Sequence, residues 1–394
     1  MRKDRFLGRF VACLEDYLHQ LDVPTSFFPR KVRQVAAERL SNSDIDTSES
    51  STPETWVKRA KIAIAKWLPF RDALTRKASN GSVGFDVAQR LNTSWARSRR
   101  GSRITVQRKP IIDARTKIFA LGSCFAREIR VALRARGYDV YPKYFDLKFD
   151  PSRQQPNMLP RFDNINHYDT FVIRQEIERA ITRQTYSPKD FWQLKNHPLA
   201  AWPQACTDPY RRKIYAADMD SLIDLSARLG ECIADGLASA DVAIITLGLT
   251  ECWRNKLNGL FVCEGPKSPR DERFSLVEFF PSTYADNYAN LAAIIDQLGA
   301  AYPKLQIVLT VSPVALHRTA MSEDVVVANM TSKTTLRAVA GEICRQYPNV
   351  IYWPSYEYAL TQDVFEADGR HVAPHYVNRI VTSFLSAHSE DPRS

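Results

Sequence analysis

One serine stands between a glycine and a cysteine at the point where an apolar run gives way to a helical pattern. The run "KIFALG" (117–122) predicts a strand and the next residues predict a helix, so Ser123 lies in a strand-to-helix turn. Free backbone N–H groups and the helix dipole favour negative charge there, which suits a nucleophile and its oxyanion. Serine is also a preferred helix N-cap whatever the function, so this position alone leaves both interpretations open.

The end of the chain offers a base and a carboxylate. In "DGRHV", Asp368 precedes His371 by three residues, in a loop just before a predicted helix. This spacing lets the carboxylate bind one imidazole nitrogen and fix the tautomer, while the other nitrogen can take the serine proton. The chain order of serine, aspartate and histidine therefore predicts acyl transfer through Ser123. The turn at Ser123 is not the GxSxG nucleophile elbow of α/β-hydrolases, because Leu121 and Phe125 occupy the positions of the two glycines.

The segment "TLGLTECW" (246–253) follows a strongly apolar run and could complete the site. Gly248 lets a backbone N–H approach an oxyanion, and the Thr250 hydroxyl is a second donor. The alternative interpretation is that Gly248 is present only because the turn requires a glycine. Glu251 and Trp253 follow, and a tryptophan beside an acidic residue is typical of sugar sites, although tryptophan more commonly packs in a core.

Three further residues follow later predicted strands, and Cys124 offers a rival nucleophile. Ser312 ends "LTVSP", His317 lies beyond it as a second candidate base, and Glu357 is in "PSYEY". A thiol at a helix N-terminus has a lowered pKa, but Cys124 would have to point where Ser123 is expected to point. The seven cysteines are scattered and include no CxxC pair, so neither a zinc site nor a disulfide framework is predicted.

The elements that must position these residues alternate between strand and helix. We predict strands at 117–122, 138–142, 241–248, 306–313 and 349–354, and helices at 124–136, 171–182, 219–238, 286–299, 332–346 and 375–387. Such alternation implies right-handed crossovers and a parallel sheet between two layers of helices. Ligands of these sheets bind beyond the carboxyl ends of the strands, where the candidate residues stand.

The first part of the chain has a different composition. Residues 1–110 hold 22 Lys and Arg against 11 Asp and Glu, and so carry the whole positive excess of the chain. Amphipathic patterns at 3–21 and 55–70 predict helices, separated by a polar connection at 41–54 and followed by a basic linker at 94–103. We therefore divide the chain into a basic, mainly helical extension (1–105) and an α/β domain (106–394). The basic surface suits an anionic membrane or glycan, or is simply a solvated helical face.

Several function classes are excluded by what the sequence lacks. No run approaches the roughly 18 apolar residues of a membrane span, and charges interrupt the N-terminal apolar stretch, so we expect a cytoplasmic protein, peripheral to the inner membrane if the extension binds lipid. Neither a Walker loop nor GxGxxG is found, so common nucleotide binding is not indicated. We expect no nucleic-acid partner, no bound cofactor and no metal.

Several motifs together resemble a known family. "LGSCFA", "TLGLTE", "LTVSPV", "SKTTLRAVAGE", "PSYE" and "DGRHV" resemble the GSCFA family pattern, in the same order, over about residues 115 to 387. That family is similar to SGNH-type esterases and acyltransferases. The resemblance implies a flavodoxin-like three-layer sandwich, Ser123 as nucleophile, His371 as base and Asp368 as its orienting carboxylate. The asparagine usual in the third block is absent, and Asn164 in "RFDNINHY" is expected to donate instead.

Two functions remain open from the sequence. The first is an enzyme that acts on carbohydrate in cell-surface polysaccharide metabolism, as an esterase if water accepts the acyl group or as an O-acyltransferase if a sugar hydroxyl does. An activated donor such as acyl-CoA fits a cytoplasmic enzyme and a basic surface. The second is a non-catalytic binding or scaffold protein that docks through its basic helices on a membrane, an anionic glycan or a protein partner.

Overall fold

The computed structural model describes residues 104, 106, 108–156, 165–195, 197, 200–263, 265–266, 271–361 and 364–390. All of them belong to Ser98–Ser394, the second of two units into which the chain divides. The predicted basic helices and linkers of residues 1–103 lie outside the described residues, and the predicted boundary near residue 105 stays a prediction.

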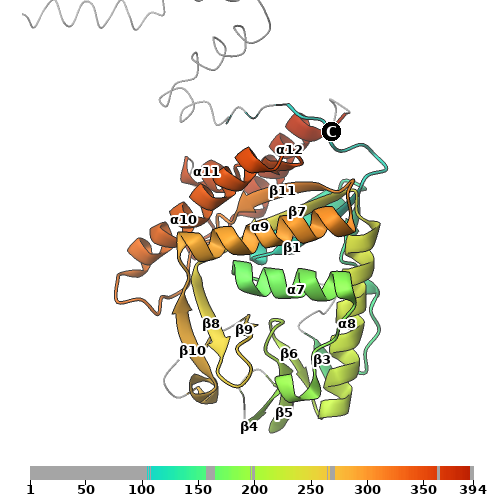
Figure 1. Ribbon diagram of the computed structural model, residues 1–394, viewed down its shortest axis with the longest axis vertical. Helices are drawn as coiled ribbons and strands as arrows, with labels where there is room; N and C mark the ends of the chain where they lie inside the picture. The colour runs from blue at the N-terminus through green and yellow to red at the C-terminus, as the bar shows by residue number, and fades with distance from the viewer. Residues whose placement is uncertain are drawn as a thin grey trace, which may run out of the picture. The chain divides into compact units, whose positions relative to one another are not determined.

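A parallel sheet of five strands forms the centre (Figure 1). The strands are β1 (Lys117–Gly122), β2 (Asp139–Tyr141), β7 (Val242–Leu247), β11 (Gln306–Val311) and β12 (Val350–Tyr352). Their spatial order is β12-β11-β7-β1-β2, and every neighbouring pair is parallel. Counted along the chain this is the order 2-1-3-4-5 of flavodoxin-like sheets. All five predicted strands are confirmed, as is the α/β class.

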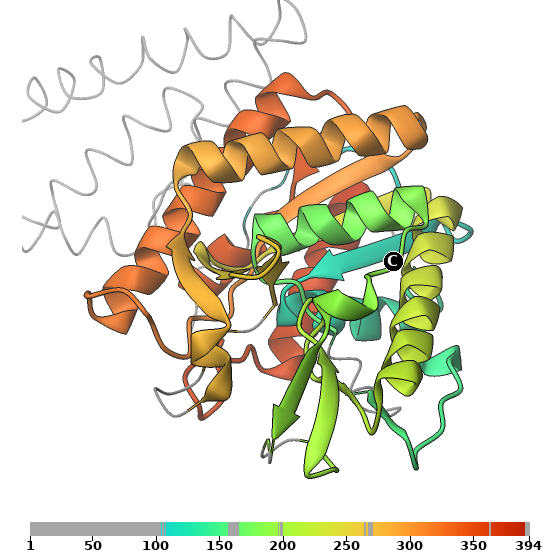
Figure 2. The ribbon, with the colours of Figure 1, turned by 60° about the horizontal axis from the view of Figure 1, so that its bottom comes forward.

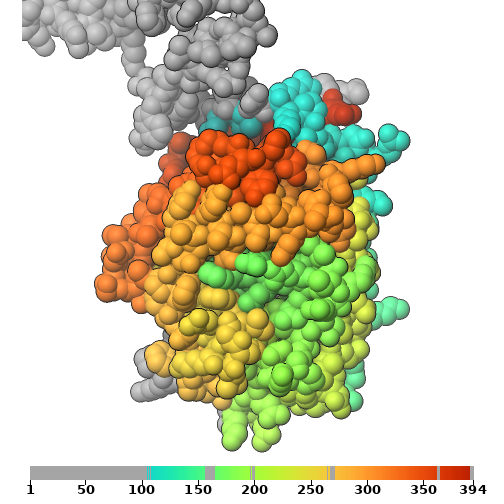
Figure 3. All heavy atoms as spheres, in the orientation of Figure 1, coloured from blue at the N-terminus to red at the C-terminus, as the bar shows by residue number. Residues whose placement is uncertain are grey.

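Helices cover both faces of the sheet because its buried strands alternate side chains between two cores. Phe119, Leu121 and Ile245 face a core shared with α7 (Thr170–Thr182), α8 (Met219–Ser239), α9 (Tyr284–Ala301) and α10 (Val325–Gln346). Ile118 and Ile244 face the opposite core, shared with α6 (Cys124–Arg134), α11 (Ser355–Leu360) and α12 (Pro374–His388). Helices α7 and α9 lie side by side across one face (Figures 1 and 3).

Two small antiparallel sheets, which the sequence patterns do not predict, stand beside the central sheet (Figure 2). One contains β3 (Gln154–Pro156), β4 (Trp192–Lys195), β5 (Gln204–Asp208) and β6 (Ile214–Ala216). The other contains β8 (Glu251–Asn255), β9 (Phe261–Val262) and β10 (Val277–Pro281). Most of these strands are very short, so each shows too few alternations for a pattern to be recognised. They matter because β8 follows β7 directly and carries two candidate site residues.

The described helices do not include one that is both long enough and apolar enough to cross a membrane.

Candidate active site

The turn after β1 is built by one glycine and one serine. Gly122 has φ +131°, and a Cβ there would lie 2.2 Å from the carbonyl oxygen of Thr246 on the neighbouring strand β7, so the position accepts only glycine. Ser123 then caps helix α6, and its Oγ accepts a hydrogen bond from the N–H of Phe125 at 3.3 Å. The predicted N-cap is therefore present.

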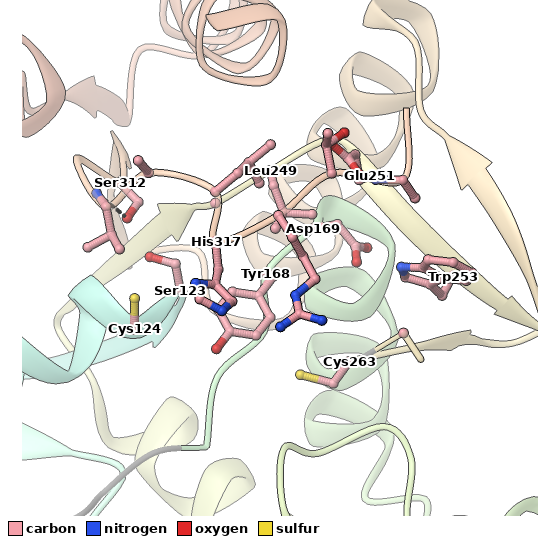
Figure 4. A pocket seen from close by; sticks show the side chains of 18 of the residues that line it. Ser123, Cys124, Tyr168, Asp169, Leu249, Glu251, Trp253, Cys263, Ser312 and His317 are labelled. Atoms are coloured by element: carbon pink, nitrogen blue, oxygen red, sulfur yellow. Dashed lines mark hydrogen bonds between the residues drawn. The ribbon is translucent and has the colours of Figure 1, made fainter. Parts of the chain in front are cut away.

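A pocket of about 660 Å³ opens at this turn and has a size suited to a small organic ligand. Its wall includes Ser123, Cys124 and His371, with Gly248 after β7 and Ser312 after β11. Ser123, Gly248 and Ser312 follow β1, β7 and β11, so the pocket lies at the carboxyl ends of central strands, where the topology places a ligand site. In Figure 4, Ser123 and Cys124 lie at one end of the pocket and Trp253 at the other.

His371 and Asp368 form the pair that their spacing predicts. A hydrogen bond of 2.5 Å joins His371 Nδ1 to Asp368 Oδ2, and Asp368 Oδ1 accepts the backbone N–H groups of Arg370 and His371. The backbone and side-chain hydrogen bonds from His371 and Arg370 hold the pKa of Asp368 below its usual range, so it is ionised at neutral pH. Nδ1 is thereby committed to the carboxylate, and Nε2 is left for a proton from the pocket.

Backbone donors near Ser123 are not equally available to an oxyanion. The N–H of Ser123 donates to Thr246 O at 3.0 Å, and the N–H of Gly248 donates to Tyr168 O at 3.0 Å. A Cβ at Gly248 would lie 2.5 Å from that same carbonyl oxygen, so the glycine is needed for close packing of two loops. The N–H of Cys124, first in helix α6, has no hydrogen-bond partner among the described residues. It is the backbone donor that remains for a developing oxyanion.

Four further predicted residues line the pocket. They are Glu251, Trp253, Ser312 and His317. Glu251 is held by Thr319 Oγ1 at 2.7 Å and by the N–H of Ala320 at 2.8 Å, so its carboxylate organises the loop after β11. Trp253 packs on Phe279 of β10 at 5.1 Å between ring centroids and forms one wall. Ser312 Oγ accepts the N–H of Val314, as a turn-forming serine does.

The structure places two other predicted residues, Thr250 and Glu357, outside the pocket. Thr250 is buried, shares a 2.8 Å hydrogen bond with Ser332 Oγ, and is not among the described pocket residues. Glu357 pairs with Arg337 at 2.6 Å and accepts from the Tyr352 hydroxyl at 2.9 Å, so it stabilises the junction of α11 with α10 instead. Asn164 lies outside the described residues.

Cys124 has the environment of a protonated thiol. Burial raises the pKa of this thiol above its usual range, and the nearby positive charges of Lys333, Arg212 and Arg370 only partly oppose that effect. The described residues also contain no group of His, Cys, Asp and Glu side chains that could hold a metal ion. The raised pKa of the Cys124 thiol thus favours Ser123 as the candidate nucleophile.

A buried cation that the sequence patterns do not reveal also lines this pocket. Lys333 on α10 is only 2% exposed and lines the pocket, and its Nζ donates to the carbonyl oxygen of Gly248 at 2.6 Å. It stands in the family segment "SKTTLRAVAGE", but a lysine within an amphipathic helix is normally expected in solvent. Burial, aided by the charge of Arg370, lowers the pKa of Lys333 to about 7.

This burial predicts a stability cost that depends on pH. The unfolded chain holds the lysine proton more tightly, so between pH 7 and about 10.4 the unfolded state binds more protons and wild-type stability rises with pH. Below pH 7 the full cost is present, about 5 kcal/mol by the same linkage. We expect Lys333→Met to be about 2–3 kcal/mol more stable than wild type at pH 7, because removal of the burial cost outweighs loss of the hydrogen bond to Gly248. This gain in stability should disappear as the pH approaches about 10.

Urea unfolding of both proteins across this pH range measures the effect. Lys304→Met, which changes an exposed lysine, is the matched control and should follow wild type. A Lys333→Met variant with unchanged or reduced stability at pH 7 would contradict the assigned burial cost.

The described domain matches a known protein family. The pattern described as the GSCFA family matches residues 117–384, more than half of the chain. The matched region runs from β1 into α12 and contains Ser123, Lys333, Asp368 and His371. A comparison with curated proteins finds no similar sequence.

Proposed function

The chain belongs to the GSCFA family, and on this basis we propose that it is a serine-dependent enzyme that transfers an acyl group from an ester to a hydroxyl acceptor. One observation carries the proposal: Ser123 and His371 line the same pocket, and the carboxylate of Asp368 holds the Nδ1 atom of that histidine. A nucleophile, a base and an orienting carboxylate on neighbouring loops are the requirements of acyl-enzyme chemistry.

The proposed reaction has two halves. Ser123 Oγ attacks the ester carbonyl carbon while His371 Nε2 accepts the hydroxyl proton, and the tetrahedral oxyanion accepts a hydrogen bond from the N–H of Cys124. Collapse breaks the ester C–O bond, and the leaving alkoxide takes the proton from His371. An acceptor hydroxyl then attacks the acyl-enzyme with His371 again as base, which regenerates Ser123.

We propose carbohydrate as the substrate class. Trp253 supplies an aromatic wall at the end of the pocket opposite Ser123, and Glu251 lies on the same strand with its carboxylate at the pocket edge. Aromatic faces with adjacent polar groups suit sugar rings. With water as acceptor the reaction is ester hydrolysis, and with a sugar hydroxyl it is O-acyl transfer from a donor such as acyl-CoA.

Labelling with a fluorophosphonate probe tests the proposed nucleophile. We expect the full-length wild-type protein to be labelled covalently, and Ser123→Ala to give no label, because the probe needs an activated serine oxygen. Cys124→Ser is the neighbouring control and should retain labelling. Absence of label on the wild-type protein would overturn the proposal and favour a binding protein, and equal labelling of Ser123→Ala would assign the reaction to another residue.

A further inference from the structure

The pocket around Ser123 has an excess of positive charge. Four cationic side chains line it, namely Arg212, Arg318, Lys333 and Arg370, against the two carboxylates of Asp169 and Glu251. Both carboxylates are already engaged: Asp169 caps helix α7 through the N–H groups of Phe171 and Val172, and Glu251 holds the loop after β11. Burial raises the pKa of Asp169 to about 7 and lowers that of Lys333 to about 7, so each of these two groups is partly charged at neutral pH, while the three arginines remain fully charged.

Lys333 is the most enclosed of these cations. Its side chain is almost wholly buried, and within the described residues its Nζ makes a single hydrogen bond, to Gly248 O. An ammonium group has three donors, so two of them are left without a protein acceptor there. Buried polar groups are normally satisfied, and an unsatisfied cation in a pocket wall indicates a ligand that accepts hydrogen bonds.

Arg370 lines the same pocket as Lys333, and its charge helps to lower the pKa of Lys333. Its Nε and Nη2 atoms donate to Ala315 O at 3.2 and 3.1 Å, which fixes the guanidinium at the pocket wall. In the part of the chain that the structure describes, neither Lys333 nor Arg370 forms a salt bridge with a carboxylate. Two adjacent cations without a counter-charge form an unfavourable arrangement that a bound anion would relieve.

We propose that Lys333 and Arg370 form an anion subsite beside Ser123, which binds a carboxylate or phosphate group of the substrate. The free N–H of Cys124 and the N-terminus of α6 add positive potential at the same end of the pocket. The inference rests on the proposed function only in taking this pocket as the substrate site. The inference adds that the substrate is an anionic ester, and that the enzyme selects this substrate by its negative charge.

Calorimetric titration of full-length Ser123→Ala tests the subsite without any turnover. The probes are glutarate, inorganic phosphate and glutaramide, the neutral counterpart of glutarate. We expect glutarate or phosphate to bind about 10- to 100-fold more tightly than glutaramide at pH 7, because charge-assisted hydrogen bonds contribute that much. Which of the two anions binds identifies the acyl carboxylate or a donor phosphate as the recognised group.

Two variants in the Ser123→Ala background locate the binding. Lys333→Met and Arg370→Gln should each weaken anion binding about 10- to 100-fold, whereas Lys304→Met, with the same change in charge, should leave it unchanged. Arg370→Gln tests the subsite independently of Lys333→Met, because it leaves the buried lysine in place. At pH 8, anion binding should also take up part of a proton, because the anion favours the ammonium form of Lys333 in the presence of Cys124 and Arg370.

The outcomes separate the subsite from the catalytic proposal. Equal binding of glutaramide, no binding of either anion, or binding that survives both pocket variants would overturn the subsite. If the wild-type protein is labelled by the fluorophosphonate but neither anion binds, the anion-subsite proposal is rejected and the proposal of Ser123 as nucleophile is retained. Anion binding without labelling would support the subsite and remove the serine chemistry.

Discussion

Alanine at Ser123 or at His371 should lower kcat/KM for p-nitrophenyl acetate by about 10⁴- to 10⁶-fold, as loss of a nucleophile or its base does in serine hydrolases. The two residues act in one step, since the base removes the proton only as the nucleophile attacks. The double variant Ser123→Ala/His371→Ala should therefore be no slower than the slower single variant. Initial rates with a no-enzyme blank measure all three proteins.

His317 provides the decisive control for this prediction. It lines the same pocket as His371, but it is His371 that binds Asp368. We expect His317→Ala to remain within about tenfold of wild type, and Asp368→Asn to lose less than His371→Ala, since the aspartate only orients the base. A large loss in His317→Ala with near-normal rates in His371→Ala would assign the base to His317.

Replacing Glu176 by glutamine should destabilise the domain by about 3–5 kcal/mol, because it removes the closer of the two buried carboxylates that pair with Arg211 and leaves this buried cation with Asp208 at 3.4 Å. Glu176 on α7 is 1% exposed and binds Arg211 through both oxygens, at 2.6 and 3.0 Å, while His167 Nε2 lies 3.0 Å from Oε2. Burial raises the pKa of Glu176, but Arg211 and His167 outweigh it and hold the pKa below its usual range.

The pH dependence of this effect has a defined sign. A carboxyl group with a depressed folded-state pKa contributes stability above its unfolded pKa of about 4.3, and that contribution disappears as pH falls. The gap in unfolding free energy between wild type and Glu176→Gln should therefore narrow below about pH 4. Glu178→Gln is the matched control on the same helix, where a half-exposed pair with Arg174 should cost at most about 0.5 kcal/mol. Equal losses in the two variants would contradict the assignment.

The same buried network connects stability to the pocket. His167, whose side chain contacts Glu176, also donates its backbone N–H to the carbonyl oxygen of Gly122 at 2.7 Å. The adjacent Tyr168 uses its carbonyl oxygen to bind the N–H groups of Gly248 and Leu249. One short loop therefore fixes the turns that precede Ser123 and follow β7, and the ion pair beneath it holds that loop in place.

Local patterns were sufficient where a structural requirement was itself local. Each strand of the central sheet is an apolar run, and each long helix has its own periodicity, so both are predicted from the sequence, although α10 begins seven residues before its predicted start at residue 332. The pair Asp368 and His371 was also predicted, because three residues of separation bring the side chains together within one turn. Helix capping by Ser123 needed only the sequence of the turn.

The remaining features depend on segments distant in the sequence. Gly248 has its N–H bound by Tyr168 and its carbonyl oxygen bound by Lys333, partners that lie 80 and 85 residues away. Glu357 follows a strand of the central sheet, as several other candidates do. Its contacts with Arg337 and Tyr352 nevertheless hold it outside the pocket. Neither outcome is visible in a local pattern, because the competing partner comes from another element.

The sequence by itself therefore determined the parallel α/β architecture, the turn at Ser123 and the Asp368–His371 pair, since backbone propensity and short spacing act within one element. Only the tertiary structure decided which donors stay free for an oxyanion and which cations gather around the nucleophile. Lys333 is the clearest case: in a helix sequence it resembles any solvent-exposed lysine, and only the packing of α10 against the Gly248 turn buries its charge beside Ser123.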